Sequence, residues 1–145
     1  MKICIVVANY YPKISKDLLH GAENVLKKQG IANYKKILAP GIYELPSIIS
    51  SFINNYDAFI ALGCVIKGKT PHFNFISTAT INAIMDLSIK YNKPIGNGII
   101  TCLNKKQALE RSNPKMKNKG GEAAQAAISV HRILKNDSKW SFAES

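Results

Sequence analysis

The stretch Ala61–Phe75, ALGCVIKGKTPHFNF, passes from an apolar run through a turn with glycine and lysine into an amphipathic segment. This order predicts a strand, an anion-binding loop and a helix. Gly68 would let the backbone turn where a side chain would clash, Thr70 is a favoured helix cap, and Pro71 suits the first helical position. Free N–H groups at a helix start attract phosphate, so we expect an anion beside this loop, with His72 in the first turn.

Apolar runs and helical stripes alternate along the rest of the chain. Continuous β-branched runs predict strands covered on both faces, and apolar residues at helical spacing predict the helices between them. The sequence therefore predicts an α/β three-layer sandwich with a four-stranded parallel sheet flanked by helices. In the fourth strand, Gly96 and Gly98 indicate that another backbone or a ligand comes close. The expected strands are Ile3–Ala8, Tyr34–Ala39, Asp57–Gly63 and Pro94–Thr101; the expected helices span 15–29, 43–53, 71–91, 105–111 (capped by Asn104) and 120–134.

Length and charge bound the class of protein. The 145 residues fit a single domain, with residues 136–145 as a polar tail. The first apolar run is too short for a signal-peptide core or a membrane span, which favours a cytoplasmic protein without a membrane partner. The net charge of +11 invites a nucleic-acid interpretation, but the lysines are dispersed and no nucleic-acid motif is present. Nucleic acid is therefore not the expected partner.

The three cysteines, Cys4, Cys64 and Cys102, are an odd number with no close pair. This spacing indicates neither a disulfide framework nor a zinc site, and we predict no metal centre. Burial as small hydrophobic residues is the favoured interpretation. A nucleophilic cysteine is the minor alternative, because no paired base is evident.

Four loops carry the chemically informative residues. Tyr10 and Tyr11 follow the first expected strand, Ile42–Glu44 the second, Lys67–His72 the third and Thr101–Asn104 the fourth. Ligands of parallel sheets collect at the carboxyl ends of the strands. We therefore expect aromatic side chains, a carboxylate, an anion loop and a histidine to meet at one edge of the sheet.

Five segments together resemble the lumazine synthases, which make 6,7-dimethyl-8-ribityllumazine in riboflavin biosynthesis. They occur in the family's order and at its spacing, from Lys2 to about Leu134. One segment alone would be weak evidence, whereas five in register are strong evidence. The segments are APGIYELP (39–46), ALGCVIKGKTPHFNF (61–75), PIGNGIIT (94–101), QALERS (107–112) and NKGGEAA (118–124).

The resemblance implies a flavodoxin-like fold and a transferase reaction without a metal or an organic cofactor. Members condense 5-amino-6-(D-ribitylamino)uracil with 3,4-dihydroxy-2-butanone 4-phosphate and release phosphate and water. Their sites lie between neighbouring subunits of a pentamer. The resemblance therefore implies small-molecule substrates and a homo-oligomer, a pentamer or a multiple of pentamers, in which residues from Asn97 onward serve the next subunit's pocket.

Residues that match the family's motifs take implied roles. His72 matches the proposed proton-transfer residue, and Tyr10 falls where an aromatic ring stacks on the pyrimidine. Glu44 would accept hydrogen bonds from the ribityl hydroxyls. The other implied contacts are Ile42 and Tyr43 around the ribityl chain, Val65 and Ile66 along the substrate, Gly68, Lys69, Thr70 and Arg111 at the phosphate, Asn97 at the uracil, and Lys115 and Lys119 near the ribityl and phosphate region.

Several of these residues also have structural interpretations. Glu44 could simply occupy the first turn of its helix, and Arg111 could be a solvated cation at a helix end. Lys69 stands where many members carry Glu, and Tyr11 where many carry Asn. These departures leave open a second hypothesis, a non-catalytic flavin- or lumazine-binding paralogue. A basic nucleic-acid-binding domain is a third and less favoured hypothesis.

Overall fold

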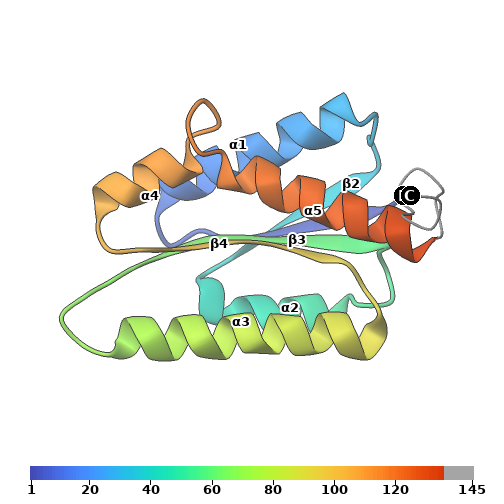
Figure 1. Cartoon of the computed structure of the whole chain (residues 1–145). Helices are drawn as coiled ribbons and strands as arrows, with labels where there is room; N and C mark the ends of the chain where they lie inside the picture. The colour runs from blue at the N-terminus through green and yellow to red at the C-terminus, as the bar shows by residue number, and fades with distance from the viewer. Residues whose placement is uncertain (136–145) are drawn as a thin grey trace, which may run out of the picture.

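A computed structural model describes residues 1–135; the predicted polar tail 136–145 lies outside the described residues. Four parallel strands form one sheet in the order β2-β1-β3-β4. Helices α1, α4 and α5 cover one face and α2 and α3 the other (Figure 1). This arrangement confirms the predicted flavodoxin-like three-layer sandwich. The elements are β1 (Ile3–Ala8), α1 (Pro12–Lys28), β2 (Tyr34–Ala39), the 3-10 helix η1 (Ile42–Glu44), α2 (Leu45–Ser51), β3 (Ala58–Ile66), α3 (His72–Tyr91), β4 (Ile95–Cys102), α4 (Lys105–Ser112) and α5 (Lys119–Leu134).

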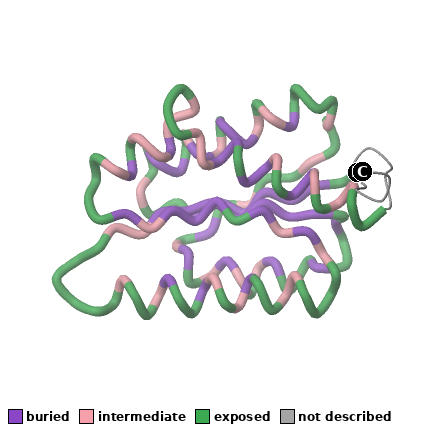
Figure 2. The backbone as a smooth tube through the Cα atoms, in the orientation of Figure 1, coloured by how far each residue is buried: buried purple, intermediate pink, exposed green. Residues whose placement is uncertain are grey.

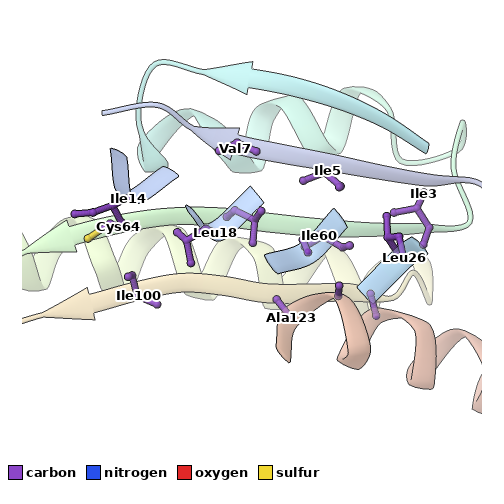
Figure 3. Close-up of a cluster of buried hydrophobic side chains, with 14 of the residues drawn as sticks. Ile3, Ile5, Val7, Ile14, Leu18, Leu26, Ile60, Cys64, Ile100 and Ala123 are labelled. Atoms are coloured by element: carbon purple, nitrogen blue, oxygen red, sulfur yellow. The ribbon is translucent and has the colours of Figure 1, made fainter. Parts of the chain in front are cut away.

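Buried residues run along the strands and recur on the helices (Figure 2), and they form two hydrophobic clusters, one on each face of the sheet. Successive strand residues point to opposite faces of the sheet, so β1 and β3 supply both cores. Ile3, Ile5 and Val7 of β1 pack toward α1 and α5 with Leu18 and Ile60 (Figure 3). The opposite face of β1 packs with α2 and α3. The central position of these strands explains their continuous apolar sequence.

Strand β3 runs three residues beyond its predicted end at Gly63. Cys64, Val65 and Ile66 pair in register with Ile100, Thr101 and Cys102 of β4. This pairing carries Val65 and Ile66 to the carboxyl edge of the sheet. The prediction ended the strand too early, because the partner that extends it is distant in sequence.

The predicted start of α3 is wrong by one residue. The helix begins at His72 and Pro71 is the N-cap. Thr70 Oγ1 nevertheless accepts a long hydrogen bond of 3.4 Å from the His72 backbone N–H, so Thr70 satisfies one N–H group at the helix start, as a capping side chain does. The steric reason given for Gly68 is also wrong, because a Cβ there would meet no atom within 4 Å.

Other helix ends follow local capping chemistry. α1 begins at Pro12, three residues before its predicted start, because proline suits the first helical positions. Asn104 caps α4 as predicted: its side-chain oxygen accepts a hydrogen bond of 2.9 Å from the Gln107 N–H. Within residues 1–135, no helix is both long and apolar enough to cross a membrane.

Glycines in β4 allow α5 to lie directly on the sheet. A Cβ on Gly96 would lie 2.0 Å from the carbonyl oxygen of Ala123, and one on Gly98 would lie 3.0 Å from the Ala123 Cβ. The prediction that another backbone or a ligand comes close is confirmed for the backbone at Gly96, whereas the two nearest atoms at Gly98 belong to side chains. Because α5 carries Lys119 at its start, this packing also sets the position of one predicted site residue.

Candidate active site

A cavity of about 220 Å³ lies at the carboxyl ends of β1 and β3, and we call it the β1–β3 cavity. Its walls come from the loops that follow β1 and β2, from the end of β3 and from the start of α3. The loop after β4 does not line it, which corrects the expectation that all four loops meet in one place. The lining residues are Tyr10, Tyr11, Gly41, Ile42, Tyr43, Cys64, Val65, Ile66, His72 and Ile76.

Aromatic rings stand at the rim of this cavity over an apolar floor. Tyr10 and Tyr43 are each 65% exposed, and the Tyr10 ring lies 5.0 Å from that of Tyr11. Ile42 and Cys64 are almost fully buried beneath them. Exposed aromatic faces above an apolar floor suit a flat heteroaromatic ring. The structure thus brings Tyr10 together with Ile42, Tyr43, Val65, Ile66 and His72, as the sequence predicts.

Burial determines the protonation of two cavity groups. It raises the pKa of the Cys64 thiol to about 12, with a further contribution from the neighbouring Cys102 thiol. Burial also raises the pKa of the Tyr11 phenol, and the nearby Cys64 and Tyr10 add to that effect. Both groups therefore stay protonated at neutral pH. A thiol held in this form is a poor nucleophile, so the interpretation of the cysteines as buried hydrophobic residues is supported.

His72 is the side chain on the cavity wall best suited to exchange protons near neutral pH. It opens α3 and is exposed, so a substrate can reach it. Gly68, Lys69 and Thr70 form the exposed loop before it and do not line the β1–β3 cavity. Their role at a phosphate stays a prediction.

Glu44 lies outside the β1–β3 cavity. It lines a hollow of about 490 Å³ between α2 and α3, which we call the α2–α3 hollow. Tyr43 lines both spaces, so the two adjoin at this residue. The hollow is lined by Tyr43, Glu44, Pro46, Ser47, Ala79, Thr80 and Ala83.

Two of the four predicted cationic site residues lie at the free edge of β4 and do not line the cavity that contains His72. Arg111 and Lys119 line a hollow of about 490 Å³ there, together with Asn97, and we call it the β4 hollow. Lys115 does not line it, whereas Lys117, for which no role is predicted from the sequence, does. The full lining is Asn97, Gly98, Ile99, Ile100, Thr101, Arg111, Lys117, Lys119 and Glu122.

Side chains in the β4 hollow cap groups of the open strand edge. Arg111 Nη1 donates to the Thr101 carbonyl oxygen at 2.9 Å, and Asn97 Oδ1 accepts from the Ile99 N–H at 3.0 Å. Lys119 pairs with Glu122 at 3.2 Å. A guanidinium has five N–H donors, so Arg111 retains donors for an anion. The hollow carries three cations against one carboxylate, which favours anion binding.

Some lining residues were missed from the sequence although a periodic signal was present. Cys64 lies two residues before Ile66 on the same face of β3, so the two line one wall. Ile76 lies one helical turn after His72, on the same side of α3. Strand and helix periodicity applied to the assigned residues would have found both.

The chain is similar in sequence to known proteins over all of its described residues. The family described as 6,7-dimethyl-8-ribityllumazine synthase matches residues 1–135. A 6,7-dimethyl-8-ribityllumazine synthase of Bartonella tribocorum is 43% identical in an alignment of 136 residues that covers 92% of this chain and 89% of that protein. One from Buchnera aphidicola subsp. Acyrthosiphon pisum is 42% identical, covering 92% and 86%. "6,7-dimethyl-8-ribityllumazine synthase 1" of Rhodopseudomonas palustris is 41% identical, covering 95% and 88%.

Proposed function

The chain belongs to the 6,7-dimethyl-8-ribityllumazine synthase family, and we propose that its active site combines the β1–β3 cavity of one subunit with the β4 hollow of a neighbour. The family's reaction condenses 5-amino-6-(D-ribitylamino)uracil with 3,4-dihydroxy-2-butanone 4-phosphate in riboflavin biosynthesis. The chain is an enzyme that catalyses this reaction. The proposal concerns which of its residues perform the reaction, and in what assembly.

The division of the predicted residues between two hollows supports this arrangement. Among residues 1–135, the β1–β3 cavity is lined by His72 and aromatic rings but by no lysine or arginine, whereas the β4 hollow is lined by Arg111 and two lysines. A substrate that carries phosphate needs the cations, and the condensation needs a proton-transfer group. The two hollows are complementary in chemistry. Contact between subunits through two different surfaces forms a closed ring when the rotation from one subunit to the next closes, and we propose a pentamer or a multiple of pentamers.

In this arrangement, the residues of the β1–β3 cavity hold the uracil and move protons. Tyr10 stacks on the pyrimidine ring, and Val65 and Ile66 pack along it. His72 transfers protons as the amine adds to the ketone, as water leaves and as the ring closes. Glu44 accepts hydrogen bonds from the ribityl chain beyond Tyr43.

Residues of the neighbouring subunit complete the phosphate end of the site. Arg111 presents its remaining N–H groups to the leaving phosphate, because a guanidinium fork matches phosphate geometry. Lys119 adds charge nearby, and Asn97 contacts the uracil. We assign a weaker role to Lys115, because it lies outside the β4 hollow. The loop Gly68–Thr70, with the ammonium of Lys69, would reach the same phosphate from the His72 side. Alignment of two bound substrates supplies a large part of the rate.

Mixing two inactive variants tests whether the site is shared. His72→Ala and Arg111→Ala should each be nearly inactive as pure oligomers. When they are dissociated together and reassociated in equal amounts, about a quarter of the interfaces should join an intact His72 half to an intact Arg111 half. The rate of lumazine chromophore formation should therefore recover to about a quarter of the wild-type rate.

Two results would contradict the proposal. Failure of the reassociated mixture to recover, with both variants assembled as the wild type is, would show that each site lies within one chain. Tight binding of the lumazine by the wild type without turnover of the two substrates would instead favour the non-catalytic paralogue.

Light scattering on the wild-type oligomer should give a mass that is a multiple of five chains.

A further inference from the structure

Two hydroxyl groups on the buried side of α3 have no hydrogen-bond partner. Thr80 is 2% exposed and Ser77 is 8% exposed, and neither Thr80 Oγ1 nor Ser77 Oγ finds a partner within residues 1–135. A buried polar group without a partner is unfavourable for folding. Such groups are rare in native proteins, and each calls for a physical explanation.

The surroundings of Thr80 and Ser77 differ. Thr80 lines the α2–α3 hollow, whereas Ser77, one helical turn earlier, does not. The hollow adjoins the β1–β3 cavity at Tyr43, which lines both. A ligand chain that extends from the cavity past Tyr43 would therefore reach Thr80 but would not reach Ser77.

The polar groups around Thr80 suit a hydroxylated chain. Glu44 presents a carboxylate, which accepts hydrogen bonds but cannot donate them when ionised. The Ser47 hydroxyl already donates to the Glu44 carbonyl oxygen at 3.1 Å, so it offers lone pairs. A threonine hydroxyl can both donate and accept. A ligand hydroxyl could thus donate to Glu44 and accept from Thr80.

The Thr80 hydroxyl can turn toward the hollow at little cost. Its Oγ1 is shut off from solvent, although the residue itself lines the space. Rotation from one staggered χ1 rotamer to another moves the hydroxyl into the position held by the methyl group or by the Cβ hydrogen, and threonine populates two rotamers in helices. This rotation breaks no hydrogen bond within the described part of the chain, because Thr80 Oγ1 makes none there.

We propose that Thr80 is a further substrate-binding residue whose hydroxyl bonds a hydroxyl of the substrate's polyol chain in the α2–α3 hollow, beside Glu44. This inference rests on the proposed function and adds a specificity residue to it. Polyol binding then explains why α3 keeps an unpartnered hydroxyl at this position.

Thr80→Val tests the assignment, because valine keeps the shape and removes the hydroxyl. The KM for the ribitylaminouracil substrate should rise between about 3-fold and 10-fold, the loss expected for one hydrogen bond between neutral groups. The kcat and the KM for the four-carbon phosphate should stay unchanged. The melting temperature should hold or rise, since a buried hydroxyl without a partner has been removed. Thr80→Ser, which keeps the hydroxyl, should have the wild-type KM.

Ser77→Ala is the matched control, because it removes a second buried hydroxyl from the same helix outside the hollow. Its kinetic constants should equal those of the wild type. An unchanged KM in Thr80→Val, or an equal rise in Ser77→Ala, would overturn the assignment while leaving the proposed function intact. Thr80→Ala gives the same comparison if the valine variant does not fold. Absence of turnover in the wild type would instead contradict the proposed function itself.

Discussion

Replacing His72 with alanine is expected to lower kcat at least about 100-fold, since general acid–base groups contribute factors of this size or larger. The fold should be unaffected. His72 is exposed at the first position of α3, and exposed substitutions of this kind usually change stability by less than about 0.5 kcal/mol. Steady-state formation of the lumazine chromophore measures the rate, and thermal unfolding measures the stability.

His20→Ala is the control for this experiment. His20 is also an exposed histidine on a helix, but it lies in the middle of α1. It does not line the β1–β3 cavity, the α2–α3 hollow or the β4 hollow. Its removal should leave kcat and KM unchanged. A wild-type rate in His72→Ala would show that proton transfer does not depend on this imidazole. Alignment of the two substrates would then have to account for the catalysis.

The layer arrangement could be predicted from the sequence because each strand carries its own signal. The run Ile3–Ala8 is apolar throughout, as a central strand must be, and its predicted bounds are those of β1. The end of β3 could not be predicted in this way. Val65 and Ile66 belong to the strand because β4 pairs with them, and that pairing joins segments more than thirty residues apart. The sequence around Val65 and Ile66 does not show which distant strand pairs with them.

Many of the residues that line the candidate site were predicted from the sequence. Their distribution between the β1–β3 cavity and the β4 hollow was not predicted. Each loop was identified by the strand it follows, and strand ends share one edge of a sheet. The separation of His72 from Arg111 depends on the free edge of β4, where Arg111 bonds the Thr101 carbonyl oxygen. Equally, helical spacing places Thr80 on the buried face of α3, but it cannot show whether the hydroxyl finds a partner. Both features arise from tertiary geometry.

The close approach of α5 to β4 gives the largest expected effect on stability. Gly96→Ala should destabilise the protein by about 3 kcal/mol or more, at the upper end of the cost of overpacking. The added Cβ would lie 2.0 Å from the Ala123 carbonyl oxygen and 2.9 Å from its carbonyl carbon. These are backbone atoms, so no rotamer change relieves the clash, and α5 itself must move. Urea unfolding measures the loss.

Gly68→Ala separates this steric effect from the general cost of replacing a glycine. A Cβ at Gly68 meets no atom within 4 Å, and its φ is not positive, so alanine fits without strain. The free energy of unfolding should change by less than about 0.5 kcal/mol. If Gly96→Ala proved as stable as Gly68→Ala, α5 could not lie against β4 at the distance described. The position of Lys119 in the β4 hollow depends on the same contact, so the proposed shared site would lose part of its support as well.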